Sequence, residues 1–324
     1  MKPGRSGGKS SGGTGARKKA ASPRPSGAGG GAGGGGGARS GGPRSRAAGG
    51  ARQFASHGQG RIGGVSPTGA PARKPTKTLG GEQIEGRQAV RELLIAGRRR
   101  VREIWVSAEL DESETIADIL EIARHERVPV QHVARKRLEA TARCEAPQGI
   151  IAYADGVPEI ELTTLLKRVP GKQPFLVAVD GVTDPGNLGA LLRCCDGAGV
   201  DGVVLPRHRA VHITPTVAKA AAGAVEHVRL AMVGGLPAAL QQMKDSGVWV
   251  VGLDDEADRE LFSIGEYATD AICLVMGAEG AGLSRLVRDR CDLIVSIPML
   301  GRLSSLNVSA AAALATYEVV RARR

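Results

Sequence analysis

The chain has 324 residues, enough for two ordinary domains, and its positive charge is concentrated in residues 1–80, which contain 15 Lys and Arg, 25 of the 47 glycines and no Asp or Glu. No run approaches the ~18 consecutive apolar residues of a membrane span, no signal-peptide core is present, and the five cysteines show neither a CxxC pair nor a metal-like spacing. These features argue against a membrane-spanning or disulfide-stapled protein, and we expect a cytoplasmic protein with reduced thiols and no bound metal.

Residues 1–81 are predicted to be a disordered, basic, glycine-rich tail, because they lack the apolar side chains that would offset the entropy of ordering. The remaining residues carry 29 bases and 33 acids. The tail can act as an electrostatic tether to a polyanion such as RNA, or it can be a solvated extension with little effect on specificity. The glycine run Gly33–Gly37 argues against a transit peptide.

A small α/β domain is predicted over residues 82–155. Apolar residues at helical spacing alternate there with short β-branched runs, and Gly97 is a helix stop signal. The expected elements are a helix at 84–97, a strand at 103–107, a helix at 114–125, a strand at 128–133, a helix at 136–142 and a strand at 149–153.

Residues 156–173 are predicted to be a proline-containing linker with one helix at 162–168, and residues 174–324 to form a second domain. Its expected strands are 175–181, 202–205, 228–232, 248–253, 272–276 and 293–297, and its expected helices are 187–197, 215–224, 236–246, 282–290 and 307–323. Such alternation predicts a mostly parallel sheet covered on both faces.

The strand at 175–181 is followed by a chemistry-bearing segment that ends at Arg193. A Pro-Gly turn is expected after the strand, and then a helix that begins at Asn187 as its N-cap. Arg193 lies off the apolar stripe of this helix, where a guanidinium can hold a phosphate through two hydrogen bonds. An ordinary surface arginine is the alternative.

Two further segments follow strands, where α/β folds tend to place ligand sites. Gly277–Ser284 is a glycine-rich loop without the Lys and Ser/Thr of a P-loop and without a GxGxxG match. The segment Ile297–Ala310 places Ser305 and Asn307 at a helix start, where simple capping is the alternative to a functional role.

Together the three segments resemble the three sequence motifs of the SPOUT class of RNA methyltransferases, in its TrmH (SpoU) branch of ribose 2'-O-methyltransferases. The matching residues are Asn187, Gly189 and Arg193 in the first motif, Gly277, Glu279, Gly280, Gly282 and Leu283 in the second, and Pro298, Ser305, Leu306, Asn307 and Ser309 in the third. The third motif departs from its common spelling at Leu300 and at Arg302-Leu303. The segments 85–90 and 148–152 are similar to the small L30e-like substrate-binding module of this family.

The resemblance implies a deep trefoil knot in the C-terminal domain, with S-adenosyl-L-methionine bound in it by Gly277, Ile297 and Leu306, and it implies a homodimer. It implies five catalytic residues, namely Asn187, Arg193, Glu279, Ser305 and Asn307. A guanidinium normally stays protonated and is a poor base. We therefore expect Arg193 to act as an electrostatic organiser that the other four residues help to fix together with the ribose.

The function that the resemblance implies is S-adenosylmethionine-dependent methylation of a ribose 2'-hydroxyl in RNA. A guanosine of 23S ribosomal RNA is the first choice, because those enzymes pair the knot with the small N-terminal domain. A tRNA guanosine-2'-O-methyltransferase and a thiostrepton-resistance-type ribosomal RNA adenosine methyltransferase share the motifs and remain alternatives. A non-catalytic RNA-binding protein is disfavoured, because all five expected catalytic residues are present.

Overall fold

The computed structural model describes residues 78–110, 113–208 and 212–324. The expected tail therefore lies outside the described residues except for its last four, 78–81. Among the helices that the structure describes, none is long and apolar enough to cross a membrane. In the same residues, no group of three or more His, Cys, Asp or Glu side chains is arranged to hold a metal ion.

The first sheet has four strands in the order β1-β4-β2-β3. Its strands are β1 (Gln83–Glu85), β2 (Val101–Ser107), β3 (Val130–Val133) and β4 (Ile150–Ala154), and only β2 and β3 pair in parallel. The helices α1 (Arg87–Ala96) and α2 (Glu114–His125) pack on one face, and α3 (Arg135–Thr141) packs on the other through Leu138. Two layers of helix thus enclose this small sheet.

The helix predicted at 84–97 is wrong in its first residues, because Gln83–Glu85 is a strand and the helix begins at Arg87. The side chains alternate along this strand: Ile84 packs in the core under α1 and α2, whereas the buried Gln83 hydrogen-bonds the buried Glu85. Gly86 then takes a φ of 98°, which glycine adopts without steric cost, and thereby separates strand from helix.

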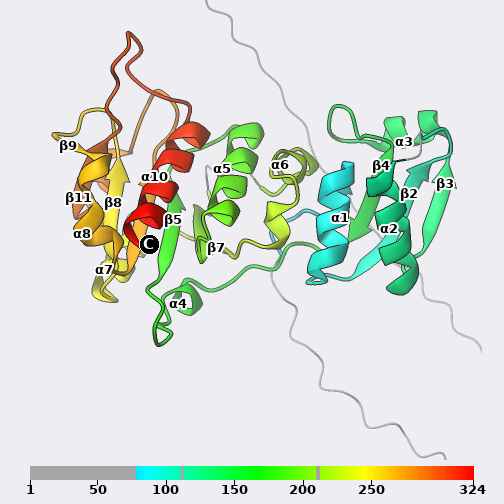
Figure 1. The fold of residues 1–324 in the computed structure, drawn as a ribbon, viewed down its shortest axis with the longest axis horizontal. Helices are drawn as coiled ribbons and strands as arrows, with labels where there is room; N and C mark the ends of the chain where they lie inside the picture. The colour runs from blue at the N-terminus through cyan, green and yellow to red at the C-terminus, as the bar shows by residue number, and fades with distance from the viewer. Residues whose placement is uncertain (1–77, 111–112, 209–211) are drawn as a thin grey trace, which may run out of the picture. The chain divides into compact units, whose positions relative to one another are not determined.

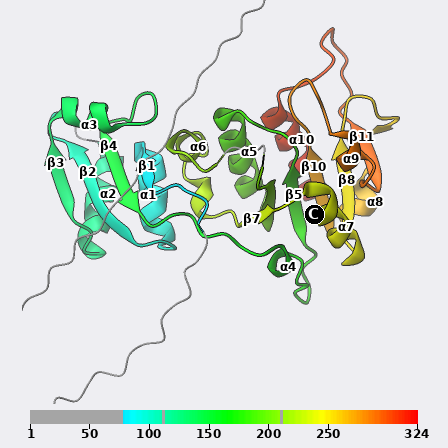
Figure 2. The same ribbon diagram turned by 180° about the vertical axis from the view of Figure 1, so that it is seen from behind.

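The second sheet has seven strands in the order β7-β6-β5-β10-β8-β11-β9, and each neighbouring pair is parallel, as the alternating pattern predicted. The strands are β5 (Phe175–Val179), β6 (Gly202–Pro206), β7 (Leu230–Val233), β8 (Trp249–Leu253), β9 (Arg259–Glu260), β10 (Ile272–Met276) and β11 (Leu293–Ser296). The strand β10, late in the chain, lies between β5 and β8 at the centre of the sheet (Figure 2).

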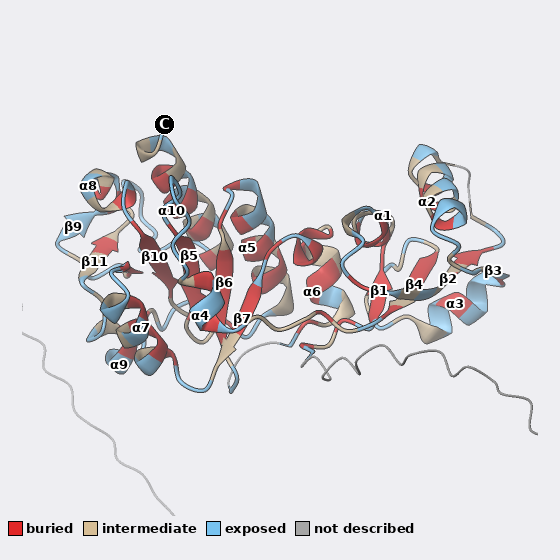
Figure 3. Ribbon diagram, turned by 90° about the horizontal axis from the view of Figure 1, so that it is seen from below, coloured by how far each residue is buried: buried red, intermediate tan, exposed pale blue. Residues whose placement is uncertain are grey.

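Helices cover both faces of this sheet. On one face lie α5 (Pro185–Gly197), α6 (Pro215–Ala220) and α10 (Val308–Ala322), and on the other lie α4 (Leu162–Leu165), α7 (Leu236–Asp245) and α9 (Arg285–Arg288). Figure 1 shows α5 and α10 in front of the strands, and Figure 2 shows α7 and α9 from behind. The strands β5, β6 and β10 are almost entirely buried between the two layers (Figure 3), whereas both residues of the edge strand β9 are exposed. Side chains of consecutive strand residues enter opposite cores, which explains the continuous apolar runs.

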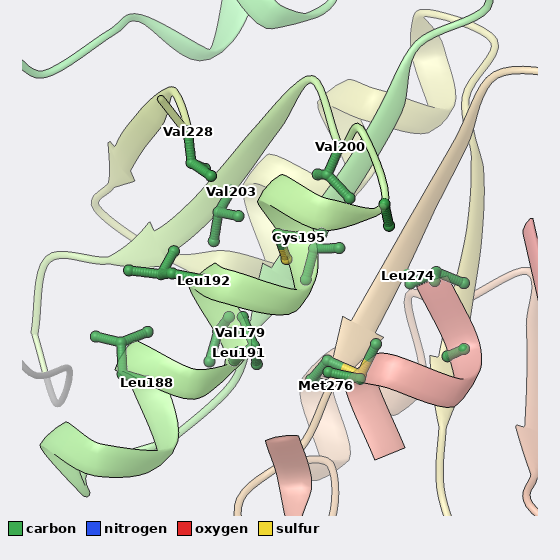
Figure 4. Close-up of a cluster of buried hydrophobic side chains, with 14 of the residues drawn as sticks. Val179, Leu188, Leu191, Leu192, Cys195, Val200, Val203, Val228, Leu274 and Met276 are labelled. Carbon is green, nitrogen blue, oxygen red and sulfur yellow. The ribbon is translucent and has the colours of Figure 1, made fainter. Parts of the chain in front are cut away.

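The core under α5 shows how the apolar stripe positions this helix. Leu188, Leu191, Leu192 and Cys195 are all at most 1% exposed and pack with strand residues such as Val179 (Figure 4). Because these positions repeat at helical spacing, one side of α5 faces the sheet along its whole length. Its first turn is thereby placed at the carboxyl end of β5.

Several predicted boundaries were wrong where glycines or turns intervene. The helix expected at 282–290 is reduced to α9, because Gly282 has a φ of 62° and Ser284 precedes the helix. The helix expected at 215–224 ends at Ala220 and is followed by a 3₁₀ turn, η1 (Ala224–Glu226). The strand β9, the 3₁₀ turn η2 (Leu261–Ser263) and the short helix α8 (Gly265–Ala268) were not predicted.

Two cysteines are expected to be chemically inert in the folded protein. Burial raises the pKa of the thiols of Cys195 and Cys273, so that almost no thiolate, the reactive form, exists near neutral pH. Mass spectrometry after iodoacetamide treatment at about pH 8 should find both unmodified, and both modified in denaturant. Alkylation of either thiol in the native protein would contradict this placement in the core.

Candidate functional site

Four strand ends converge at the carboxyl edge of the large sheet. Met276, the last residue of β10, lies beside Val179 of β5 and Leu253 of β8, and Leu253 lies beside Val295 of β11. The segments that follow these strands therefore emerge side by side. This is the edge where open α/β sheets bind ligands.

A tight turn follows β10 over residues 277–283. It is closed by two backbone hydrogen bonds, from the amide of Ala278 to the carbonyl of Gly282 at 3.0 Å and from the amide of Gly282 to the carbonyl of Ala278 at 2.9 Å. A Cβ on Gly277 would lie 2.3 Å from the carbonyl carbon of Gly282, which is closer than atoms can approach. The glycine is therefore required by the turn itself.

A cavity of 450 Å³ lies against this turn. All three expected cofactor-binding residues, Gly277, Ile297 and Leu306, line it together with Glu279 and Ser305. The remaining lining residues are Leu253, Asp254, Asp255, Glu256, Met276, Ala278, Gly280, Ala281, Gly282, Leu283, Arg288, Val295, Met299, Ser304, Val308 and Ala311. The volume is in the range of small-molecule sites, and its walls combine apolar side chains with exposed backbone.

Acidic residues that the sequence analysis did not single out also belong to this site. Asp254 pairs with Arg288 at 2.8 Å and accepts a hydrogen bond from the amide of Leu283, so it braces the turn. Asp180 accepts from the amide of Ser284 at 2.8 Å on the other side of the turn. The sequence could have identified these two residues by their position, because Asp180 and Asp254 each follow a buried strand directly.

A polar cluster lies next to the cavity and joins all three motifs. The amide nitrogen Nδ2 of Asn187 donates to Glu279 Oε2 at 3.1 Å, and the oxygen Oδ1 of Asn187 accepts from Asn307 Nδ2 at 2.8 Å. Asn307 also caps α10, because its Oδ1 accepts from the amide and the hydroxyl of Ser309. Asn187 thus connects residues that lie 92 and 120 positions away in the chain.

The expectation that Asn187 is the N-cap of its helix is wrong, and its side chain is therefore available for these contacts. The N-cap of α5 is Asp184, which accepts from the amide of Asn187 at 2.6 Å. Pro185 occupies the first turn, where its missing N–H has no partner to lose. The expected Pro-Gly turn is therefore the beginning of the helix.

Two of the expected catalytic residues lie outside this hydrogen-bonded cluster. Arg193 is exposed on α5, and the described residues offer it neither a hydrogen bond nor an ion pair. Ser305 is exposed in the loop before α10 and reaches the site only as a lining residue of the cavity. Gly189, the remaining match in the first motif, packs α5 on α6, since a Cβ there would lie 2.5 Å from that of Ala220.

Two family profiles match the chain. The profile described as the SpoU rRNA Methylase family matches residues 174–317, and the profile described as RNA 2'-O ribose methyltransferase substrate binding matches residues 83–159. The first covers the large sheet with the cavity and the polar cluster, and the second covers the small sheet.

Similar proteins match both parts at once. The chain is 38% identical over 246 residues to the 23S rRNA (guanosine-2'-O-)-methyltransferase RlmB of Pseudomonas putida, covering 75% of this chain and 97% of that protein. It is 36% identical over 244 residues to YacO of Bacillus subtilis, named for the TrmH family of tRNA/rRNA methyltransferases, with coverage of 75% and 96%. The crystal structure of the SpoU methyltransferase AviRb from Streptomyces viridochromogenes in complex with AdoMet is similar with a TM-score of 0.62 and 26% identity, over 74% of this chain and 90% of that one.

Proposed function

Because the chain belongs to the SpoU rRNA methylase family, we propose that it methylates a ribose 2'-hydroxyl in RNA with S-adenosyl-L-methionine as the methyl donor. The observation that carries this proposal is the cavity at the Gly277 turn with the Asn187–Glu279–Asn307 cluster beside it. The cavity has the size and character of a cofactor site, and the cluster offers polar groups to a hydroxyl-bearing substrate.

The cavity fits S-adenosylmethionine in volume and in chemistry. Apolar walls from Met276, Ile297 and Leu306 suit the adenine, and the carboxylates of Asp255 and Glu256 suit a cation. The bound cofactor supplies an electrophilic methyl group on a positively charged sulfonium. We assign cofactor binding to Gly277, Ile297 and Leu306, with Gly277 acting through the turn that it allows.

The catalytic roles follow from which side chains hold one another. Asn187 and Asn307 hold Glu279 and the start of α10 in one arrangement, which presents fixed polar groups to the ribose. Ser305 faces the same space from the cavity wall. Among the described residues, Arg193 makes no ion pair with a carboxylate. We assign its guanidinium to the phosphate of the target nucleotide, where it organises the charge that develops as the hydroxyl loses its proton.

Replacing Asn187 by Asp tests the cluster. The variant loses the donor to Glu279 and places two carboxylates about 3 Å apart, so that one of the two carboxyl pKa values rises. We expect kcat to fall by about 10²-fold at neutral pH. The activity should recover partly as the pH is lowered through the raised pKa, because one shared proton restores the hydrogen bond.

The pH dependence of kcat for the wild type and the Asn187→Asp variant decides this prediction. Gln241→Glu is the matched control, since it places a second carboxylate beside Asp245, 2.9 Å from the present amide, on the distant surface of α7. A control that loses as much activity, or a variant whose activity does not respond to acid, would contradict the role of Asn187.

A homodimer with a trefoil knot near its interface is our proposal for the assembly. Large apolar side chains are exposed on the loop before α10 and on α10 itself, including Leu300 at 100%, Leu303 at 75% and Tyr317 at 52%. Exposed apolar groups in one region favour a protein partner, and closed symmetric dimers are the most common soluble oligomers. A second copy of the chain would cover these side chains and place its active site at the interface.

For the substrate, we propose a guanosine of 23S ribosomal RNA, in a cytoplasmic setting. The support is the identity with RlmB over nearly the whole of that protein, and the presence of both family regions in one chain. We propose an L30e-like RNA-binding domain at 82–155, a linker at 156–173 and the knotted methyltransferase domain at 174–324. A tRNA guanosine and a ribosomal RNA adenosine remain the alternative targets.

Mapping of ribose methylation in a strain that lacks the gene tests the function and the target together. Loss of one 2'-O-methyl group in 23S ribosomal RNA, restored by the wild-type gene and not by an Arg193→Ala allele, is the expected result. Loss of a tRNA methylation instead would move the assignment to the tRNA alternative. Unchanged methylation in both RNAs would refute the proposed function.

The basic tail is proposed to tether RNA through its Lys and Arg side chains. A chain that begins at Glu82 should bind RNA more weakly, and its affinity should depend less steeply on salt, because fewer counterions are released. Titrations at several salt concentrations measure both quantities. Equal affinity and equal slope would identify the tail as a solvated extension.

A further inference from the structure

A buried ion pair joins the part of the chain that contains the small sheet to the part that contains the large sheet. Arg99 lies between α1 and β2, and Glu226 ends the 3₁₀ turn η1. Their side chains are 2% and 3% exposed. The guanidinium donates from Nε to Glu226 Oε2 at 2.9 Å and from Nη2 to Oε1, so the pair is bidentate. Two planar groups held by two bonds permit essentially one relative orientation.

The same guanidinium also holds both ends of the small sheet domain. Its Nη1 donates to the carbonyl oxygens of Gly81 at 2.8 Å and Asp155 at 2.7 Å. These residues lie where the chain enters and leaves the segment 82–155. The neighbouring Arg98 donates to the backbone carbonyl of Glu226 at 2.6 Å. One side chain therefore connects the domain entrance, the domain exit and the methyltransferase part.

Further contacts around the pair hold the small-sheet part of the chain firmly against α6 and η1. His227 lies 3.0 Å from the carboxylate of Glu92 on α1, and Lys219 of α6 donates to the carbonyl of Ala146 at 2.8 Å. Gly223 has a φ of 90°, and a Cβ there would lie 2.4 Å from that of Glu92. The helix α1 and the turn η1 are thus packed at backbone distance around the buried charges.

We infer that Arg99 is a positioning residue for methyl transfer, an inference that rests on the proposed function. Through Glu226 it fixes the domain that binds RNA against the domain that holds the cofactor cavity. Methyl transfer requires the reacting atoms to meet at about 3–3.5 Å, so an RNA held by one domain reaches the cavity of the other only if their orientation is set. Buried ion pairs contribute little net stability compared with apolar replacements, but they can specify one geometry.

The double variant Arg99→Met/Glu226→Met tests this inference. It replaces both partners with apolar side chains and leaves no unpaired buried charge. We expect an S-adenosylmethionine affinity equal to the wild type and a kcat/KM for a 23S ribosomal RNA transcript lowered about tenfold to 100-fold, mainly through KM. Hydrogen exchange of the segments 86–92 and 215–228 should accelerate, because the domains separate more often. Arg135→Met, which breaks the exposed pair with Glu139, is the matched control.

Two results would overturn the inference. One is a double variant with wild-type kcat/KM for the transcript, and the other is unchanged hydrogen exchange at the docked surfaces. If the wild-type protein does not methylate the transcript, the proposed function fails, and hydrogen exchange alone decides whether the pair fixes the domains. Should the double variant not fold, Arg99→Lys keeps the charge and loses the bidentate geometry, and the same two measurements apply.

Discussion

Replacing Arg193 by Ala is expected to lower kcat for methyl transfer by about 10²–10³-fold while leaving S-adenosylmethionine affinity unchanged. Arg193 is exposed on α5, does not line the cofactor cavity and makes no ion pair with the described residues, so its removal disturbs neither the fold nor the cavity. Loss of one preorganised charged donor at the reacting phosphate costs about 10²–10³-fold in kcat. Single-turnover transfer to the target RNA and calorimetric titration of the cofactor measure the two quantities.

Arg229→Ala is the matched control for Arg193. Arg229 is also an exposed arginine of the large domain, but it directly precedes β7, at the opposite edge of the sheet from the cavity. The control should retain wild-type transfer. Wild-type turnover of Arg193→Ala on the correct RNA would show that Arg193 has no catalytic role, and a parallel loss of cofactor affinity would place it in the cofactor site.

Replacing Gly277 by Ala is expected to lower the affinity for S-adenosylmethionine by at least about 100-fold, equivalent to about 2.8 kcal/mol. In the structure, the cause of this loss of affinity is disruption of the turn, and not blockage of the cavity by a bulky side chain. The added Cβ would lie 2.3 Å from the carbonyl carbon and 2.5 Å from the carbonyl oxygen of Gly282, so the two hydrogen bonds that close the turn must break. The cavity then loses one wall.

Calorimetric titration of the cofactor and thermal unfolding distinguish this local effect from loss of the fold. Gly265→Ala is the matched control, because a Cβ at Gly265 meets no atom within 4 Å and its φ is not positive. The control should bind the cofactor like the wild type. If a Gly277→Val variant bound the cofactor with unchanged affinity, the assignment of the cofactor site to this turn would be refuted.

Periodicity in the sequence located those elements whose pattern is local and uninterrupted. The strand Ile272–Met276 and the helix Glu114–His125 were predicted with the bounds that the structure shows. Errors occurred where a single backbone dihedral decides the outcome, as at Gly86 and Gly282. The two-residue strand β9 was missed because its existence depends on pairing with β11, which is distant in the chain.

The site shows the same division between what local sequence patterns predict and what contacts between distant segments decide. The sequence by itself determined that glycines and polar residues follow apolar strands, and its resemblance to a known family singled out Gly277, Glu279 and Asn307. Only the tertiary structure decided that β10 lies between β5 and β8, and that Asn187 hydrogen-bonds Glu279 and Asn307. The physical reason is that helix and strand patterns arise from neighbours a few residues apart. These contacts depend instead on which strands, distant in the chain, lie next to each other in the sheet.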